Sequence, residues 1–586
     1  MDKLNLDLAL PTVNESTAHP IANDRGKSQV RRKLAWTLIP LTLGYLTFSH
    51  ITPRASSSHS HHVNYTAQCI QPSALFPKDT PELAKAFEYV STPAFFNTSI
   101  ERLSGAVRMK TETFDDLGEI GVDKRWDVFY AFHEYLEKTF PRVHEKLKVE
   151  KVNTHGLLFT WQGSNPDLKP TTLMAHQDTV PVPADTIPAW DYPPWSGFFD
   201  GKYVWGRGSS DCKNQLIATL STISLLLDAN FVPKRTILLS YGFDEETFGY
   251  HGAGNISSLL QSRYGDDGLA VVVDEGASFE EAWGTVFAKP GAAEKGATNV
   301  EITVRTPGGH SSIPRDHTSI GILSEIVYLI ESTQYPTRLY DENPYYTQLQ
   351  CGAAYSPDFD PKLKKLLDRR LKHGSGLYLD GGHTCAKKHD ELALEAAKQG
   401  PEIKYLLQTS QAVDIISGGA KVNALPERAQ AIVNHRINVG ESAQVVFDHL
   451  TKLAAHVAKK HNLTLNAFTP ETASSITLTH NDVLPPAPVS PSSPHTPYSI
   501  LSGTNRAIYG EDIITTPGIM TGNTDTRFFW DLTKHIFRFA PGYDESEESG
   551  LGNIHTVNEK VSVKAHVNSV KWFMTFLRNL DESTLE

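Results

Sequence analysis

A strand-forming apolar run that stops at three consecutive carboxylates is the feature that most constrains the fold. Residues 236–249 read TILLSYGFDEETFG, and the apolar part ends at Asp244, Glu245 and Glu246. In open α/β sheets, ligands bind beyond the carboxyl ends of buried strands. Neighbouring carboxylates repel one another, so a buried group of them needs cations or protons for compensation. By itself, the stretch fits either a binding site or a solvated acidic turn.

The same pattern recurs three times nearby. Apolar runs or a Gly-rich bend lead to His176 with Asp178, to Asp211, and to Asp274. His176 and Asp178 are two residues apart and lie on one side of an extended chain. Each of these residues alone could be a core histidine, a helix cap or a turn acid. Four such strand ends between residues 171 and 276 instead indicate a shared site.

A two-metal site that shares one carboxylate needs a further nitrogen donor in this chain. The loop GNIHTVNE, residues 552–559, offers His555 just before the closing helix. The alternative is that His555 is a surface histidine, one of 24 in the chain. Cys212 follows Asp211, but no second thiol lies nearby in sequence, so we expect a small buried residue there and no ligand.

In chain order, the motifs HxD, GxGxxD, DEE, a strand-end Asp and a late His resemble those of the M20 metallopeptidases, and within them the Gly-Xaa carboxypeptidases called carboxypeptidase S. The resemblance covers roughly residues 76–580. It implies two zinc ions, with these roles: His176 and Asp274 hold one, Glu246 and His555 hold the other, Asp211 bridges them, Glu245 is the general base and Asp178 orients His176. A set of His and carboxylate ligands suits zinc and leaves cobalt or manganese open.

Length and charge limit the remaining classes of protein. The chain has 586 residues, 40% of them hydrophobic, which is too long for one simple core and predicts two or more domains. The formal net charge of −12 argues against nucleic acid or an anionic membrane surface as the main partner.

The amino-terminal part predicts a membrane anchor. Residues 1–33 are polar and end in a basic cluster, which predicts a disordered cytosolic tail. Residues 34–53 lack Asp, Glu, Lys and Arg and could cross a bilayer core ~30 Å thick as a signal anchor; a cleaved signal peptide and a core helix are the alternatives. A Ser/His-rich lumenal stalk would follow over residues 54–75. The glycosylation sequons that agree with a secretory route begin at Asn64, Asn97, Asn255 and Asn462.

The body predicts an α/β catalytic domain interrupted by a smaller α+β domain. We assign residues 76–296 and 476–586 to the catalytic domain. Between them, residues 297–475 follow the order strand, helix, two strands, helix, strand, which is ferredoxin-like and resembles the lid domain of M20 enzymes. Residues 335–411 are a long insertion in this domain, without an assigned role. It contains Cys351 and Cys385, which could form a lumenal disulfide.

The resemblance also implies residues that contact substrate. In the lid, His310 would stabilise the oxyanion, while Asn423 and Arg436 would hold the substrate carboxylate, for which an Arg fork is well suited. These residues would act either on closure within one chain or in the partner subunit of a homodimer formed through the lid. The specificity pocket would involve Asn523, Asp525 and Arg527.

These observations predict a zinc-dependent carboxypeptidase that releases C-terminal residues from short peptides. The resemblance implies a type II protein of the vacuole membrane, with its catalytic domain in a lytic lumen. One alternative is an N-acyl amino acid hydrolase or synthase of the same family. A catalytically inactive binding protein of the same fold is the other, but the presence of Glu245 and of every implied ligand argues against it.

Overall fold

The computed structural model describes residues 64–374, 389–547 and 552–585. The predicted cytosolic tail, the signal anchor and the first part of the stalk, residues 54–63, lie outside these residues. Across the three described ranges, no helix has both the length and the apolar character needed to cross a membrane.

An eight-stranded mixed sheet, here called the large sheet, has the order β1-β2-β6-β3-β7-β20-β10-β19. Its central strands β6, β3, β7 and β20 run parallel to one another, so their carboxyl ends meet at one edge. The bounds are β1 (Lys148–Val152), β2 (Gly156–Trp161), β3 (Thr171–His176), β6 (Ile237–Gly242), β7 (Val271–Ala277), β10 (Gly291–Glu294), β19 (Gly518–Met520) and β20 (Ile536–Phe539).

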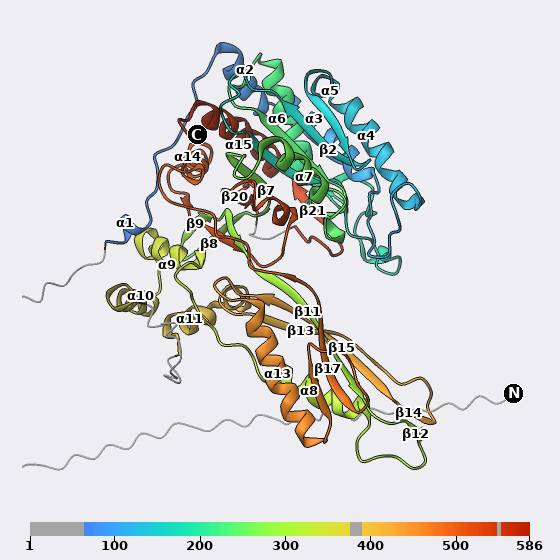
Figure 1. Ribbon diagram of the computed structural model, residues 1–586. Coiled ribbons are helices and arrows are strands. Elements are labelled where there is room, and N and C mark those ends of the chain that lie inside the picture. Colours follow the sequence, from blue (N-terminus) through green and yellow to red (C-terminus); the bar gives the residue numbers. More distant parts are fainter. Residues whose placement is uncertain (1–63, 375–388, 548–551, 586) are drawn as a thin grey trace, which may run out of the picture. The chain divides into compact units, whose positions relative to one another are not determined.

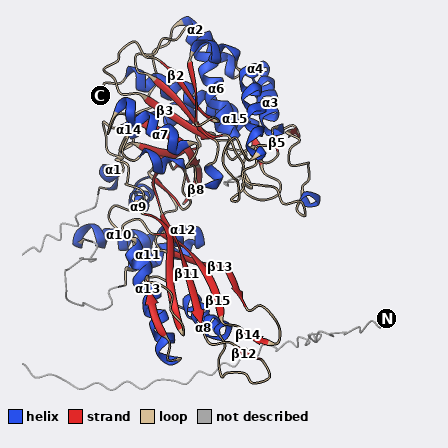
Figure 2. Cartoon of the chain, turned by 45° about the vertical axis from the view of Figure 1, so that its right-hand side comes forward, coloured by secondary structure: helices blue, strands red, loops and turns tan. Residues whose placement is uncertain are grey.

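Alternate residues of the central strands pack into two separate apolar cores. The helices that cover the sheet include α6 (Lys213–Asp228), α7 (Ala253–Tyr264) and α15 (Val563–Glu582) (Figure 2). Leu173 and Val273 belong to the core that contains α6 and α15, whereas Met174 and Val272 belong to the core that contains α7. Because side chains alternate along a strand, the near-continuous apolar runs of the sequence fill both faces.

The small sheet has five strands in the order β13-β15-β11-β17-β16 (Figure 1). Its elements are β11 (Gly296–Arg305), α8 (Ser319–Ser332), β13 (Ser410–Gly418), β15 (Arg428–Ile437), α13 (Ala443–Lys460), β16 (Thr464–Ala467) and β17 (Ser475–Leu484). Buried and part-exposed positions alternate along β15, and the buried ones share a core with α8 and α13. The sheet has five strands where the predicted order had four; β16 is short and parallel to β17, and β17 runs past residue 475 to Leu484.

The insertion forms helices that pack on their own core. They are α9 (Pro344–Tyr355), α10 (Pro361–His373), α11 (Glu391–Ala396) and α12 (Pro401–Leu406). Apolar side chains of all four helices contribute to this core, those of α12 at its partly buried edge, and Tyr65, Ala293 and Ile519 join it from other parts of the chain. The expected disulfide between Cys351 and Cys385 is wrong: Cys351 is bonded to Cys69, 282 residues earlier, because α9 packs against the amino-terminal helix α1 (Tyr65–Gln68).

The remaining helices and short strands lie outside the two sheets. The helices are α2 (Pro81–Val90), α3 (Pro93–Arg108), η1 (Lys124–Asp127), α4 (Val128–Thr139), α5 (Pro141–Lys146), η2 (Ile187–Ala189), η3 (Glu245–Thr247), η4 (Ala397–Gln399), α14 (Pro497–Tyr509) and η5 (Asp525–Phe529). The strands are β4 (Phe198–Phe199), β5 (Tyr203–Trp205), β8 (Phe279–Ala282), β9 (Thr285–Ala288), β12 (Gly309–His310), β14 (Ala424–Leu425), β18 (Ile514–Thr515) and β21 (Lys560–Ser562).

Candidate metal centre

His176 ends β3 and is the buried centre of the candidate site. Its Nε2 atom lies 3.0 Å from Oδ1 of Asp211 and 3.2 Å from Oε1 of Glu275. Its Nδ1 atom lies 3.0 Å from the backbone oxygen of Asp178. An imidazole fixed at one nitrogen and surrounded by carboxylates at the other has the arrangement of a metal ligand.

Asp211 connects His176 to a second histidine. Its other oxygen, Oδ2, lies 3.0 Å from Nε2 of His555, and the same nitrogen lies 3.1 Å from Oε2 of Glu246. Potential ligand atoms of His176, Asp211 and Glu246 all lie within 4.8 Å of one another. The structure thus gathers residues from β3, from the bend before α6, from the turn after β6 and from the loop before β21.

The bend that carries Asp211 depends on a glycine. Gly208 has φ +82°, and a Cβ atom there would lie 2.6 Å from the Thr179 side chain. A residue with a side chain would therefore be strained by its backbone and would also clash. This need explains the second glycine of the GxGxxD motif.

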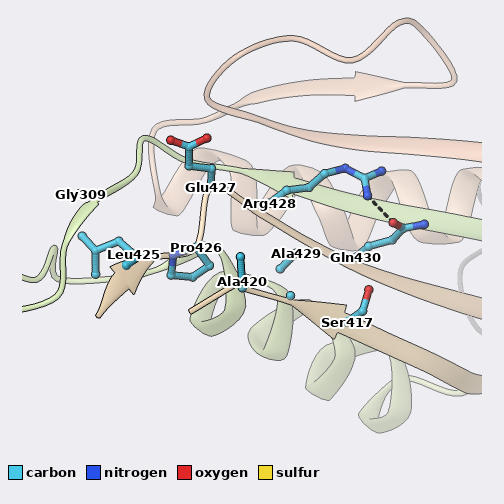
Figure 3. Close-up of a pocket in the computed structure, with 12 residues that line it drawn as sticks. Gly309, Ser417, Ala420, Leu425, Pro426, Glu427, Arg428, Ala429 and Gln430 are labelled. Atoms are coloured by element: carbon cyan, nitrogen blue, oxygen red, sulfur yellow. Dashed lines mark hydrogen bonds between the residues drawn. The ribbon is translucent and has the colours of Figure 1, made fainter. Parts of the chain in front are cut away.

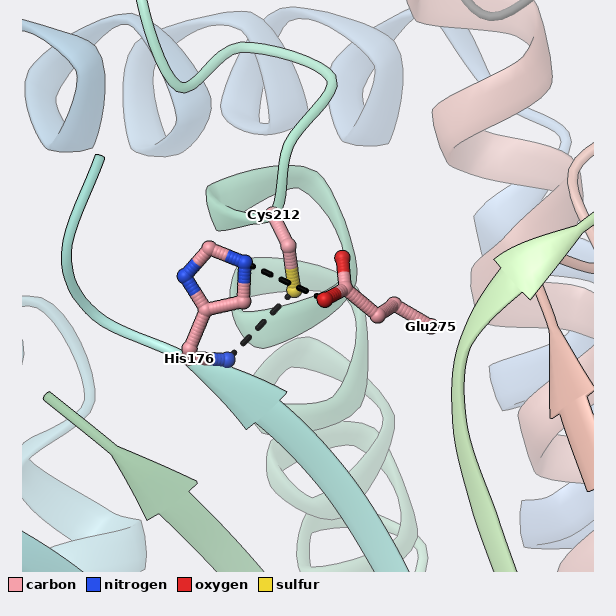
Figure 4. A group of neighbouring side chains, drawn as sticks. All are labelled: His176, Cys212 and Glu275. Atoms are coloured by element: carbon pink, nitrogen blue, oxygen red, sulfur yellow. Dashed lines mark hydrogen bonds and ion pairs between the residues drawn. The ribbon is translucent and has the colours of Figure 1, made fainter. Parts of the chain in front are cut away.

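Glu275 is a candidate ligand that we did not predict. Its carboxylate belongs to a second group of potential ligand atoms, with His176 and Cys212 (Figure 4). The preceding residue, Asp274, contributes to neither of the two groups found among the described residues. Neighbouring side chains of a strand point to opposite faces, so Asp274 and Glu275 cannot both face His176 from a regular strand. The sequence DEG, residues 274–276, shows two adjacent acids as candidates, but it does not indicate which of them faces the site.

Cys212 is fully buried, as expected, and its sulfur accepts a hydrogen bond from the backbone N–H of His176 at 3.4 Å. This contact places the thiol beside the site. Among the described residues, no second free cysteine lies near it.

Asp178 is completely buried and connects several parts of the site through its contacts. Its carboxylate accepts hydrogen bonds from the backbone N–H groups of Glu245 and Glu246, at 3.2 and 3.1 Å, and from the Thr113 hydroxyl at 2.8 Å. Its Oδ1 atom also lies 3.3 Å from Nδ1 of His176. One side chain therefore orients both the histidine and the turn that carries the two glutamates.

The site carries more negative charge than its histidines can neutralise. Burial raises the pKa of Glu245 well above its usual value, and it raises the pKa of Glu275 to about 8. Hydrogen bonds with Asp211 and Glu246 raise the pKa of His555 to about 10. Burial alone would lower the pKa of His176, but the carboxylate of Glu275 and its other acidic neighbours raise it well above the usual range.

These observations fit divalent metal ions. Carboxylates gathered in a buried place hold protons unless cations compensate their charge. The donors are imidazole nitrogens and carboxylate oxygens, which suit zinc and other divalent first-row metals. Glu275, Asp211 and Glu246 with the two histidines offer ligands for two ions that share Asp211.

Asp525 and Arg527 lie beside the turn after β6. Asp525 is buried against the backbone there: a Cβ atom on Gly249, which has φ +63°, would lie 1.9 Å from its Oδ1. Burial and the neighbouring Asp244 raise the pKa of Asp525 well above its usual value. Arg527 donates a hydrogen bond to the backbone oxygen of Phe248. Both residues therefore support the loop that follows Glu246.

Arg436 lies beside Asn523, whereas the residue expected to share its carboxylate-binding role was Asn423. Nη1 of Arg436, on β15, donates to Oδ1 of Asn523 at 2.6 Å. Asn523 in turn donates to the backbone oxygen of Lys295 at 2.6 Å. Burial lowers the pKa of Arg436, and a buried guanidinium of this kind favours an anionic ligand.

His310 and Asn423 form a separate group at one end of the small sheet. His310 lies on β12, which pairs with β14, and the backbone N–H of Ser311 donates to the Asn423 oxygen at 3.2 Å. A pocket of about 510 Å³ adjoins this ribbon, lined by residues that include Gly309 and Leu425 (Figure 3). Among the described residues, no hydrogen bond or ion pair joins His310 or Asn423 to the residues around His176.

The predicted glycosylation residues are all exposed, as a modified asparagine must be. They lie before α1 (Asn64), in α3 (Asn97), in α7 (Asn255) and after α13 (Asn462).

Comparisons with known proteins find a family and relatives that this chain resembles over most of its length. The model of peptidase family M20/M25/M40 matches residues 172–579. The chain is 41% identical over 511 residues to carboxypeptidase S of Saccharomyces cerevisiae, which covers 84% of this chain and 85% of that protein. It is 34% identical over 499 residues to the human N-fatty-acyl-amino acid synthase/hydrolase, which covers 82% of this chain and 87% of that protein.

Solved structures with the same fold are more distant in sequence. Human carnosine dipeptidase 1 has a TM-score of 0.57 at 14% identity, with 86% of this chain and 100% of that chain covered. A metallo-carboxypeptidase of the M20 family from Sulfolobus solfataricus has a TM-score of 0.55 at 18% identity, with 82% and 99% covered. Metallopeptidases of the M20 family typically depend on two metal ions. The chain therefore belongs to peptidase family M20/M25/M40 and is a hydrolase of that family.

Proposed function

We propose that the chain is a two-zinc carboxypeptidase that releases C-terminal residues from short peptides, including Gly-Xaa dipeptides. The observation that carries this proposal is the position of Asp211, each of whose carboxylate oxygens lies 3.0 Å from a different histidine. A carboxylate in this position can be shared by two ions ~3.5–4 Å apart. His176 and Glu275 would complete one ion's ligands, and Glu246 and His555 the other's.

The ligand assignment changes one expectation. The resemblance implies Asp274 as a ligand of the first ion. The proposal assigns this role to Glu275 instead, because its carboxylate lies beside His176. Asp211, Glu246, His176 and His555 keep their predicted roles in the proposal.

Side chains of the protein itself would transfer the protons in the reaction. When bound, the two metal ions would acidify a water molecule and polarise the scissile carbonyl. Glu245 would take a proton from the attacking water and give it to the departing amine as the C–N bond breaks. The carboxylate of Asp178 holds the Glu245 turn in place because it accepts a hydrogen bond from the Glu245 N–H.

Arg436 would select substrates with a free C-terminus. Its guanidinium donates a hydrogen bond to the neutral amide oxygen of Asn523. When substrate binds, the guanidinium can donate to the substrate carboxylate instead, which is the stronger acceptor. Asn423 would contribute to the same recognition and His310 would donate a hydrogen bond to the oxyanion, after closure within one chain or from a partner subunit in a homodimer. Asp525, Arg527 and Asn523 would line or support the pocket for the leaving residue.

The test combines metal analysis with a choice of substrates. The purified full chain should contain about two zinc ions, the number that a shared-carboxylate site requires. It should cleave N-blocked dipeptides with a free C-terminus and leave their C-terminal amides intact. A protein that holds no metal, or that cleaves amides as fast as free acids, would contradict the proposal.

A second candidate reaction is hydrolysis or synthesis of N-fatty-acyl amino acids. The 34% identity to the human synthase/hydrolase of that name favours testing it. Both reactions use a free amino acid carboxylate and differ in the acyl part. Faster turnover of N-oleoyl amino acids than of N-blocked dipeptides would select this alternative.

We also propose that the enzyme lies in a vacuolar lumen, held by a signal anchor in residues 34–53. The disulfide between Cys69 and Cys351 supports an oxidising compartment, because such bonds are rare in reducing cytosol. The exposure of Asn64, Asn97 and Asn462 supports glycosylation on the same route. Sensitivity of the protein's apparent mass to an N-glycan-removing enzyme, together with its recovery in the membrane fraction, tests both points.

A further inference from the structure

A buried glutamate that is not a candidate ligand joins the two loops that carry Asp211 and His555. Glu559 lies four residues after His555 and is fully buried. Its Oε1 atom accepts hydrogen bonds from the backbone N–H groups of Ser210 and Asp211, at 3.0 and 3.1 Å. It therefore contacts the main chain of the shared carboxylate residue directly.

The backbone of Glu559 makes a second connection to the same bend. Its carbonyl oxygen accepts a hydrogen bond from the N–H of Gly206 at 2.9 Å. The next residue, Lys560, begins β21, which pairs with β5 immediately before the bend. The bend that carries Asp211 is thus held at its beginning and at its end by one residue of the His555 loop.

The charge of Glu559 is balanced inside the protein. Nη1 of Arg207 donates to Oε2 of Glu559 at 2.6 Å, and the exposed fraction of the Arg207 side chain is only 4%. Because Arg207 occupies Oε2, the other oxygen remains aimed at the two amides. The pair also keeps the negative charge of Glu559 from adding to the carboxylates around His176.

We propose that Glu559, held by Arg207, is a positioning residue that fixes Asp211 relative to His555 and so sets the affinity for both metal ions. The inference rests on the proposed two-metal function. Asp211 is the shared ligand, so a small displacement of its backbone weakens the contacts to both ions. Groups that orient metal ligands typically change metal affinity by about 10- to 100-fold when they are removed.

The competing explanation is that the pair only joins β21 to β5 and stabilises the fold. Two variants of Glu559 separate these roles. Glu559→Ala removes the acceptor of the two amides, whereas Glu559→Gln keeps one oxygen that can accept from them but loses the charge that pairs with Arg207. A matched control is Glu150→Gln, because Glu150, on the edge strand β1, is also paired with an arginine: it accepts two hydrogen bonds from Arg263, at 2.7 and 2.6 Å.

The experiment measures the affinity of the metal-stripped full chain for Zn²⁺, in competition with a chromophoric chelator. Circular dichroism of each stripped variant verifies that it is folded at the assay temperature. Glu559→Ala should weaken Zn²⁺ binding by about 10- to 100-fold. Glu559→Gln should recover part of this loss, and Glu150→Gln should bind as the parent does.

Three results would overturn the inference. If folded Glu559→Ala binds Zn²⁺ as tightly as the parent while the parent binds two ions, the positioning role is wrong and the proposed function stands. If Glu559→Gln loses as much affinity as Glu559→Ala, the charge pair and not the hydrogen bonds to the bend governs the effect, and the proposed geometry is wrong. A parent chain that binds no Zn²⁺ overturns the proposed function together with this inference.

Discussion

At the scale of single residues, the acids of β7 show how strand geometry selects between neighbours. Glu275 lies 3.2 Å from His176, whereas Oδ2 of Asp274 is buried without a hydrogen-bond partner among the described residues. Burial raises the pKa of Asp274 to about 6. The two carboxylates therefore face different environments although they are adjacent in sequence.

This difference predicts separate effects of two conservative substitutions. Glu275→Gln should weaken the binding of one of two Zn²⁺ ions by at least about tenfold, because an amide oxygen is a poorer ligand than a carboxylate. Asp274→Asn should leave both ions bound. Chelator competition on the stripped protein measures both. The opposite order of effects would restore Asp274 as the ligand.

A buried histidine away from the site predicts how stability depends on pH. Burial lowers the pKa of His566 to about 4, and its Nε2 atom has no hydrogen-bond partner among the described residues. In the unfolded chain the value is about 6.5. Between these values the unfolded state binds more protons, so this contribution is complete above pH 6.5 and is lost as the pH falls toward 4.

The full difference corresponds to about 3 kcal/mol at low pH. His566→Leu should therefore reduce the loss of unfolding free energy between pH 7 and pH 5, as measured by urea titration. The same substitution at the exposed His373 serves as the control. An unchanged pH dependence in His566→Leu would show that this histidine does not contribute to acid sensitivity.

At the scale of elements, the insertion fastens the amino-terminal segment to the body. Besides the disulfide of Cys69, the Tyr355 hydroxyl of α9 donates to the Cys69 backbone oxygen at 3.0 Å. Gln71 exchanges two hydrogen bonds of 2.9 Å with the backbone of Thr515. The chain that emerges from the predicted anchor is thus attached to the body within a few residues of Asn64.

Loss of this covalent link should lower stability. Cys351→Ser should reduce the unfolding free energy by about 2–4 kcal/mol, as is typical when a disulfide that closes a long loop is removed. Calorimetry of the oxidised proteins measures the change. Cys385→Ser is the informative control: it should behave as the parent, and a loss equal to that of Cys351→Ser would support the pairing that the sequence had suggested.

At the scale of the whole molecule, the residues proposed to recognise the substrate carboxylate come from both sheets. Arg436 lies on the small sheet and Asn523 lies in the loop after β19 of the large sheet, yet their side chains share a hydrogen bond of 2.6 Å. In the described ranges, His310 and Asn423 have no hydrogen bond or ion pair with the residues around His176. Recognition of the carboxylate is therefore expected to precede the approach of His310.

Removal of Arg436 tests this order. Arg436→Ala should raise KM by about 10- to 100-fold for substrates with a free C-terminus, because a charge-assisted hydrogen bond contributes about 1.5–3 kcal/mol. Asn523→Ala should have a smaller effect, since Arg436 remains. Steady-state kinetics with free and amidated dipeptides measures the difference, and an equal effect on both substrates would contradict a role in carboxylate binding.

Much of the fold and of the site could be predicted because short stretches of sequence specify both. Apolar runs that end in carboxylates predict buried parallel strands with a site at one edge, and the motif order led to His176, Asp211, Glu246 and His555. The alternating pattern of residues 299–306 likewise predicted a strand of the small sheet. These patterns depend only on side-chain periodicity and on the chemistry of the ligands.

The tertiary structure alone decided which neighbours in sequence become neighbours in space. The alternation of side chains along β7 turns Glu275 and not Asp274 toward His176, and the packing of α9 on α1 pairs Cys351 with Cys69 rather than with Cys385. Glu559 became recognisable only when its carboxylate was seen against the backbone of Asp211. A sequence specifies which groups are present, but contacts between distant segments follow from the packing of the whole chain.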